Sequence, residues 1–230
     1  MTSDEATVRA VRPGWPELLA GAVAYLVAFA VVFWLLPLVE DEAVGGVFGL
    51  VASGLMGTVA FAAAWLVRVR RFPPFGVRRA RGKYFWMALG LGVAAYALGV
   101  IGAIVYTLAT GDDQNVQTGY QAAAGSGWLF LAVALIAGSV ITPVGEELFF
   151  RGVVANVLLA RWNVWIAVPV SAAVFALAHG INPVLPVAFV VGVLTALLLR
   201  WSGSIWPGVV LHAVNNTLAF LVPVVVTALS

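Results

Sequence analysis

The sequence has no cysteine and very little charge. Without cysteine the chain can form no disulfide, has no thiol nucleophile and offers no cysteine ligand for zinc. Only 10% of its 230 residues are charged, whereas about 25% are charged in an average soluble domain. So few charges cannot cover a surface that faces water. The composition therefore excludes an ordinary soluble enzyme, a disordered protein and a secreted scaffold held by disulfides.

Long hydrophobic runs dominate what is present. Hydrophobic residues make up 63% of the chain, and its mean hydropathy is +1.04. A transmembrane helix needs roughly 20 apolar residues. Segments of this kind occur at 16–39, 45–67, 85–109, 128–161, 164–180, 184–200 and 205–228. We therefore predict an all-α, polytopic membrane protein, a bundle of seven transmembrane helices, or eight if Pro143 and Gly145 break the segment 128–161 so that it folds back.

The distribution of charge predicts the orientation in the membrane. Residues 1–14 are polar and no cleavable signal follows them, so we expect the first apolar run to be a retained span. Basic residues concentrate in the loop 68–83, whereas the loops 40–44 and 110–126 contain acidic residues and no basic ones. Basic loops stay in the cytoplasm. The sequence therefore places the N-terminus and the loop 68–83 inside and the two acidic loops outside.

The small net charge of +2 gives no support to a nucleic-acid partner, and we interpret the basic loop as a determinant of topology. The expected partners are the lipid bilayer and a membrane-associated peptide or protein. The composition is rich in Ala, Gly, Val and Arg, which is typical of a GC-rich bacterial genome. We therefore expect an integral protein of a bacterial cell membrane.

A few ionisable or strongly polar residues interrupt the apolar segments of the second half of the chain. They are Glu146, Glu147 and Arg151 in one segment, His179 in the next, and His212 with Asn216 in the last. A charge at bilayer depth costs about 2.5–3.5 kcal/mol on lenient insertion scales. Such residues usually face the interior of a bundle and have a function there.

Helical spacing predicts how these side chains are grouped. Glu147 and Arg151 are four residues apart and share a helix face, so we expect them to form an ion pair. Glu146 points about 100° away from Glu147 and is free to face another helix. The pairs Phe175–His179 and His212–Asn216 have the same four-residue spacing.

Distance along the helices predicts the depth of each group. Glu146 lies 15 residues before Arg161 and His179 lies 15 residues after Val164, so a tight turn at 161–164 sets them level. His212 follows Arg200 by only 12 residues. It reaches the same depth only if helices tilt or if the segment 201–206 dips into the bundle.

These groups together predict a hydrolytic site. A carboxylate beside two imidazoles can act as a general base on a water molecule. One Glu and two His can also bind a metal ion, in particular Zn²⁺, and an Asn amide can donate a hydrogen bond to an oxyanion. Each residue alone has a structural alternative, because a membrane His often forms hydrogen bonds between helices and a Glu–Arg pair can be purely architectural.

The order and spacing of these motifs resemble a known family. Glu146-Glu147-x-x-x-Arg151, Phe175-x-x-x-His179 and His212-x-x-x-Asn216 on successive hydrophobic segments resemble the motifs of the CAAX protease and bacteriocin-processing (CPBP, or Abi) family of intramembrane proteases. This family includes the eukaryotic Ras-converting CAAX endopeptidase. The resemblance covers residues 128–220. It suggests three membrane helices in 1–127 and a catalytic core in 128–230, within one integral membrane unit.

The resemblance also implies a role for each residue. Glu146 would activate the attacking water, and His179 and His212 would orient that water or hold a metal, Zn²⁺ being the candidate. Asn216 with His212 would stabilise the oxyanion, and Glu147, Arg151 and Phe175 would support the site. We carry over the reaction, hydrolysis of a peptide bond by an intramembrane endopeptidase, and leave the substrate open because prenylated CAAX proteins are not expected in such a bacterium.

The alternative is a non-enzymatic membrane protein, that is, a scaffold, an immunity factor or a transporter-like protein on the same bundle. Transporters often contain broken helices, and the sequence has candidate breaks at Pro143, Pro183, Pro186 and Pro207. Spatial arrangement discriminates between the two. Convergence of the motif residues on a polar cavity open to the cytoplasm or to lipid favours the enzyme, and histidines that point apart exclude it.

Overall fold

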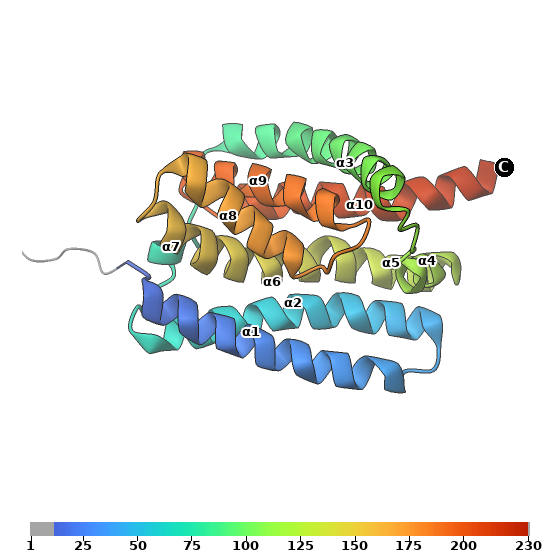
Figure 1. Ribbon diagram of the computed structural model, residues 1–230, viewed down its shortest axis with the longest axis horizontal. Helices are drawn as coiled ribbons and strands as arrows, with labels where there is room; N and C mark the ends of the chain where they lie inside the picture. Colours follow the sequence, from blue (N-terminus) through green and yellow to red (C-terminus); the bar gives the residue numbers. More distant parts are fainter. Residues whose placement is uncertain (1–11, 230) are drawn as a thin grey trace, which may run out of the picture.

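The computed structural model describes residues 12–229, and Figure 1 shows their helices packed side by side in one bundle. The elements, in chain order, are α1 (Trp15–Leu35), η1 (Leu36–Leu38), α2 (Glu42–Val67), η2 (Pro73–Phe75), α3 (Gly82–Thr110), α4 (Thr118–Gly125), α5 (Trp128–Ile136), η3 (Ala137–Ile141), α6 (Thr142–Phe149), η4 (Phe150–Ala155), α7 (Asn156–Leu159), α8 (Val164–Leu177), α9 (Leu185–Ser202) and α10 (Trp206–Leu229). No β-strand occurs within 12–229. The prediction of an all-α polytopic membrane bundle is confirmed.

Each predicted span coincides with a helical segment. Within the described residues, six helical segments are long and apolar enough to cross a membrane. α8 is apolar but has 14 residues, about 21 Å at 1.5 Å per residue, which is shorter than a hydrocarbon core of about 30 Å. The short helix α4 was not predicted and lies within the segment 110–126, which we expected to be a loop. Residues 1–11 lie outside the described part of the chain, so the location of the N-terminus stays a prediction.

The segment 128–161 does not fold back, so the alternative of eight spans is wrong. Trp128–Leu159 forms one 32-residue helical segment that contains two π-helical turns, η3 and η4. Pro143 lies in the first turn of α6, directly after η3. In a regular α-helix the ring of a proline clashes with the carbonyl four residues back. The wider π turn before Pro143 accommodates the ring, so the helix continues.

The two ends of the bundle carry opposite charge. The end drawn at the left of Figure 1, here called the basic end, contains the start of α1, the segment between α2 and α3, the turn between α7 and α8 and the end of α9. These segments and the first turn of α3 hold the described cations outside the site: Arg12, Arg68, Arg70, Arg71, Arg78, Arg79, Arg81, Lys83, Arg161 and Arg200. Hydrogen bonds connect the segments of this end with one another: Arg78 donates to the Gly203 carbonyl, and Arg161 donates to the Pro13 carbonyl. The opposite end, here called the acidic end, holds Glu40, Asp41, Glu42, Asp112 and Asp113.

Glu17 is a buried acid that the sequence analysis did not single out. It lies in the first turn of α1 and is fully buried. Its carboxylate accepts the Gly14 N–H at 2.7 Å and two hydrogen bonds from Arg68, each 2.8 Å long. A bidentate guanidinium–carboxylate contact is among the strong polar interactions. The pair therefore fastens the start of α1 to the end of α2.

Glycine allows α2 to touch the backbone of the helix that carries Glu146. A Cβ atom added at Gly57 would collide with the backbone of Gly145, and one added at Gly145 would collide with the Gly54 carbonyl. Close approach through small residues is the usual way in which membrane helices associate. A hydrogen bond of 2.7 Å from the Thr142 hydroxyl to the Leu50 carbonyl crosses the same contact.

We expect Gly145→Ala to lower the stability of the bundle because its methyl group has no space against the α2 backbone. Overpacking of this kind typically costs about 1–3 kcal/mol. The matched control is Gly90→Ala on α3, where an added Cβ meets nothing within 4 Å. Thermal unfolding of both variants in detergent measures the difference, and equal midpoints would contradict this account of the helix contact.

Candidate active site

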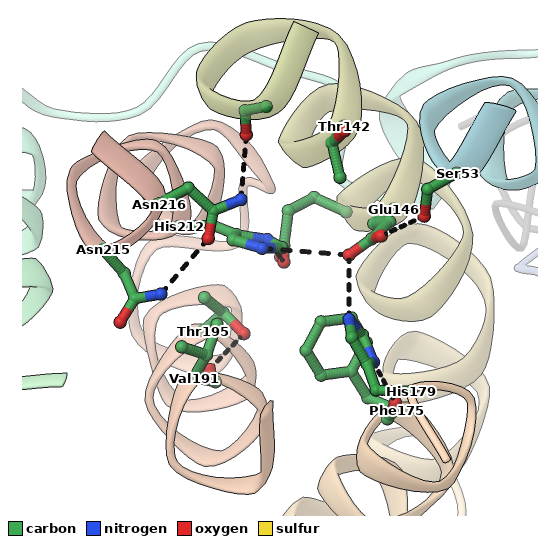
Figure 2. A network of polar contacts seen from close by, with 12 residues as sticks. Ser53, Thr142, Glu146, Phe175, His179, Val191, Thr195, His212, Asn215 and Asn216 are labelled. Carbon is green, nitrogen blue, oxygen red and sulfur yellow. Dashed lines mark hydrogen bonds and ion pairs between the residues drawn. The ribbon is translucent and has the colours of Figure 1, made fainter. Parts of the chain in front are cut away.

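Three ionisable side chains from three different helical segments meet inside the bundle (Figure 2). Glu146 lies on α6, His179 directly follows α8, and His212 lies on α10. Oε2 of Glu146 is 3.9 Å from Nε2 of His179 and 3.8 Å from Nε2 of His212. No local sequence pattern brings these groups together, so their convergence is a property of the tertiary fold.

The shortness of α8 sets the depth of His179. The helix starts at the basic end and stops at Leu177, so the residues that follow it lie deep in the bundle. Gly180 turns the chain with a φ of +86°, a conformation that glycine adopts readily. The Asn182 amide then donates to the His179 carbonyl at 2.8 Å. This hydrogen bond closes the loop on the backbone of His179.

The depth of His212 comes from the turn that precedes α10. Ser204 and Ile205 are fully buried although they connect two helices. The Ser204 hydroxyl donates to the Arg78 carbonyl, and the Ile205 N–H donates to the Gly76 carbonyl. The turn thus lies beneath the segment 76–78. The buried turn agrees with the inward dip of 201–206, one of the two alternatives stated above.

Both imidazoles are held through the same ring nitrogen. Nδ1 of His179 lies 2.9 Å from the Phe175 carbonyl, and Nδ1 of His212 lies 3.2 Å from Oε1 of Glu147. Each partner is a hydrogen-bond acceptor, which assigns the N–H to Nδ1. In the neutral form, the Nε2 lone pairs of both rings therefore face the carboxylate of Glu146.

The two oxygens of Glu146 have different surroundings. Oε1 accepts a hydrogen bond of 2.6 Å from the Ser53 hydroxyl on α2. Oε2 is buried, has no hydrogen-bond partner among the described residues and faces both histidines. Ser53 thus fixes the rotation of the carboxylate and leaves one basic oxygen directed at the imidazoles. Separations of 3.8–3.9 Å leave room for a water molecule that contacts these groups at once.

Glu147 has its own partners and does not face the space beside Glu146. Its Oε2 lies 3.2 Å from Nε of Arg151, as the four-residue spacing predicts, and its Oε1 accepts from His212. Arg151 also donates to the Thr195 hydroxyl at 2.6 Å, and Thr195 donates to the Val191 carbonyl. Charge is thereby paired across α6, η4, α9 and α10 in a buried network.

Phe175 is a wall of this network. It is buried, and the Arg151 guanidinium lies over its ring at 4.2 Å from the centroid. Its edge contacts both imidazole rings, with centroid separations of 4.7 Å to His179 and 5.8 Å to His212. A cation over an aromatic face is stabilised electrostatically, more strongly where water is excluded. Phe175 therefore packs against the cation and positions both bases.

Asn216 satisfies a backbone group that Pro143 leaves open. In the π turn η3 the Thr142 N–H bonds to the Ala137 carbonyl, so the next donor in that pattern belongs to residue 143, which is proline and has no N–H. The Asn216 amide donates instead to the Gly138 carbonyl at 2.8 Å, and its oxygen accepts from Asn215. Asn216 lines the cavity described next, and its role as an oxyanion donor stays a prediction.

A cavity of about 340 Å³ adjoins the three converging groups. Its polar lining includes Ser53, Glu146, His179, His212, Asn215 and Asn216, and apolar residues form most of the remainder. The size lies in the range of ligand-binding pockets, about 300–1,000 Å³. Among the lining residues Glu146 is the single Asp, Glu, Lys or Arg. The site is thus an apolar pocket with one carboxylate and two imidazoles at its base.

The donor types fit zinc, but their separation does not. Zinc binds imidazole and carboxylate at about 2.0–2.2 Å, which sets adjacent tetrahedral ligands about 3.4 Å apart. Oε2 of Glu146 is 3.9 and 3.8 Å from the two nitrogens. Within residues 12–229 no group of three His, Asp or Glu side chains is arranged to hold a metal ion. The arrangement of these three residues therefore does not fit a zinc site.

Comparison with known proteins agrees with the motifs. Residues 127–218 match the family model of type II CAAX prenyl endopeptidases, Rce1-like. An uncharacterized 24.3 kDa protein of Escherichia coli is 32% identical over 87 residues, which are 36% of this chain and 40% of that protein. The chain thus matches less than half the length of this curated relative. No solved structure matches the chain.

The matched segment contains every motif residue from Glu146 to Asn216. The match confirms the family resemblance that the sequence predicts, over the segment 127–218. The match to this family supports the prediction that the protein is a membrane protease. The apolar helices and the family together indicate an integral membrane protein.

Sequence reasoning missed three polar residues of the network: Ser53, Thr195 and Asn215. Hydroxyl groups are common in membrane helices, so a single Ser or Thr does not indicate a functional site. One signal for Ser53 was present, since it lies in a stretch of α2 with glycines at 49, 54 and 57 that marks a helix contact. We assigned only hydropathy to residues 1–127, yet Ser53 of this half contacts Glu146.

We expect Arg151→Ala to destabilise the protein more than Glu146→Ala does. Removing the guanidinium leaves Glu147 buried without its cation, and breaking one side of a buried pair costs about 3–5 kcal/mol. The control is Arg200→Ala, which removes an exposed arginine at the basic end. Folded yield and thermal unfolding in detergent measure the effect. Equal midpoints for Arg151→Ala and Glu146→Ala would contradict the structural role of the pair.

Proposed function

We propose that this protein is an intramembrane endopeptidase that hydrolyses a peptide bond of a membrane-associated substrate with water activated by Glu146. The convergence of Oε2 of Glu146 with both histidine Nε2 atoms carries the proposal. A buried carboxylate oxygen without a hydrogen-bond partner is costly and is typical of a reactive site. The family match at 127–218 supports the same reaction class.

In the proposed reaction Glu146 accepts a proton from water while the water oxygen attacks the scissile carbonyl. The water donates one hydrogen bond to Oε2 of Glu146 and the other to a histidine Nε2, because both rings direct lone pairs toward the carboxylate. Ser53 keeps Oε1 engaged, so the proton goes to Oε2. When the tetrahedral intermediate collapses, Glu146 returns this proton to the leaving nitrogen.

Asn216 with His212 is the proposed stabilising group for negative charge on the intermediate. The Nδ1–H of His212 is directed at Glu147, and this contact orients the ring beside Glu146. The second amide hydrogen of Asn216 is available beside it, since the described contacts use one bond from its nitrogen, to Gly138. Arg151 balances the charge of Glu147 and keeps the network near neutrality.

We expect Glu146→Gln to fold normally and to abolish cleavage. Glutamine preserves the shape and the Ser53 contact but cannot take a proton from water, and a general base contributes about 10²–10⁴-fold to a rate. The matched control is Glu42→Gln, which makes the same chemical change at an exposed position of the acidic end. Quantitative proteomics of membrane-protein termini in cells that carry the wild type or either variant measures cleavage.

The expected result is a set of new termini present with the wild type and with Glu42→Gln but lost with Glu146→Gln. A folded Glu146→Gln protein that produces the wild-type set of termini would overturn the role of Glu146. If no terminus depends on the protein at all, the non-enzymatic scaffold, immunity or transporter-like function would be favoured.

A further inference from the structure

The cavity beside Glu146 extends toward the acidic end of the bundle. It reaches Leu36, Val116, Gln117 and Gln121, which belong to the connections at the acidic end. One face of α1 follows the cavity along this path, through Tyr25, Phe29 and Val32 to Leu36. None of the lining residues comes from the segments of the basic end.

On the other side of Glu146 the bundle is closed. The residues that lead from the site toward the basic end are buried, and they include Phe150, Arg151, Val153 and Val154. Phe150 packs edge-on against Phe175, with a centroid separation of 4.9 Å, and Phe75 of the loop 68–83 is fully buried. Buried side chains, and no part of the described cavity, therefore lie between Glu146 and the basic end.

The positive charge of the bundle lies at the end opposite the one that the cavity reaches. Ten described cations lie at the basic end, whereas the described charges at the acidic end are Glu40, Asp41, Glu42, Asp112 and Asp113. Basic residues near span ends are retained in the cytoplasm. The mouth of the cavity is therefore expected on the face of the membrane away from the cytoplasm.

The lining of the cavity defines the chemistry of what enters it. Apart from Glu146 and the two histidines it consists of apolar residues, neutral amides, hydroxyl groups and small residues. A charged substrate side chain would lose its hydration there without gaining a counter-ion, at a cost of several kcal/mol. Amides from Gln117 and Gln121 near the mouth can hydrogen-bond to an extended peptide backbone.

We propose that the substrate is the extracytoplasmic end of a membrane-inserted polypeptide segment, with uncharged side chains around the scissile bond. The proposal rests on the proposed function, since it names the substrate class of the same site. The substrate enters from the acidic end along the α1 face, and the layer of aromatic residues below Glu146 excludes segments that approach from the cytoplasm.

The absence of cysteine from the sequence allows a direct test by accessibility. Single substitutions Gln117→Cys at the mouth, Ala178→Cys beside His179 and Arg79→Cys in the basic loop are each exposed to a small, uncharged, hydrophilic thiol reagent that does not cross the membrane. Labelling is compared between intact spheroplasts and inverted membrane vesicles. These measurements require no catalytic activity, so they stand even if the protein is not a protease.

We expect Gln117→Cys and Ala178→Cys to be labelled in spheroplasts and to lose labelling in inverted vesicles, with Arg79→Cys showing the reverse. Labelling of Ala178→Cys from the inverted side alone would overturn the proposal. So would labelling of Arg79→Cys in spheroplasts, and so would an Ala178→Cys that reacts from neither side, because the site would then be closed to the acidic end.

The second arm locates the scissile bonds. Termini that depend on Glu146 should map to the extracytoplasmic ends of substrate membrane segments, within stretches that lack charged residues. Termini that map to the cytoplasmic side would overturn the proposed substrate class while leaving the protease function intact. Expected labelling without any dependent termini would instead count against the protease function and leave the direction of the opening established.

Discussion

Every charge in the interior of this bundle needs a partner, and this constraint shapes the second half of the molecule. Glu147 has Arg151 and His212, Arg151 has Thr195 and the ring of Phe175, and Glu146 has Ser53. Glu147 is occupied by its ion pair with Arg151 and its hydrogen bond from His212. Oε2 of Glu146 has no hydrogen-bond partner among the described residues and faces both histidines, and Glu146 lines the cavity. Pairing thus divides two neighbouring carboxylates into a structural group and a reactive group.

Much of this arrangement could be predicted from the sequence, since it depends on local rules. The seven apolar segments follow from hydropathy, the Glu147–Arg151 pair follows from four-residue spacing, and the common depth of Glu146 and His179 follows from counting residues. Each of these uses a single helix or two neighbours. The family resemblance rested on the same spacing and was confirmed over 127–218.

What could not be predicted depends on contacts between distant segments. The two π turns each add a residue to the helix without a marker in the hydrophobic pattern, so a break at Pro143 and Gly145 stayed open as the alternative to seven spans. The inward turn at 201–206 depends on its cover by residues 76–78, which are far away in sequence. Ser53 acts through a backbone contact between α2 and α6, and hydropathy carries no information on which helices touch.

The intrahelical position of the Glu147–Arg151 pair also matters for the order in which the chain enters the membrane. Thr195 follows Arg151 by 44 residues and His212 follows Glu147 by 65 residues, so neither is in the membrane yet when the helix that starts at Trp128 inserts. The pair can form within this helix alone, and it offsets two charges that would each cost about 2.5–3.5 kcal/mol at the bilayer centre. Glu146 meets Ser53, which precedes it by 93 residues and is already in place. Biogenesis can therefore proceed helix by helix, and the histidines complete the site after the carboxylates have been accommodated.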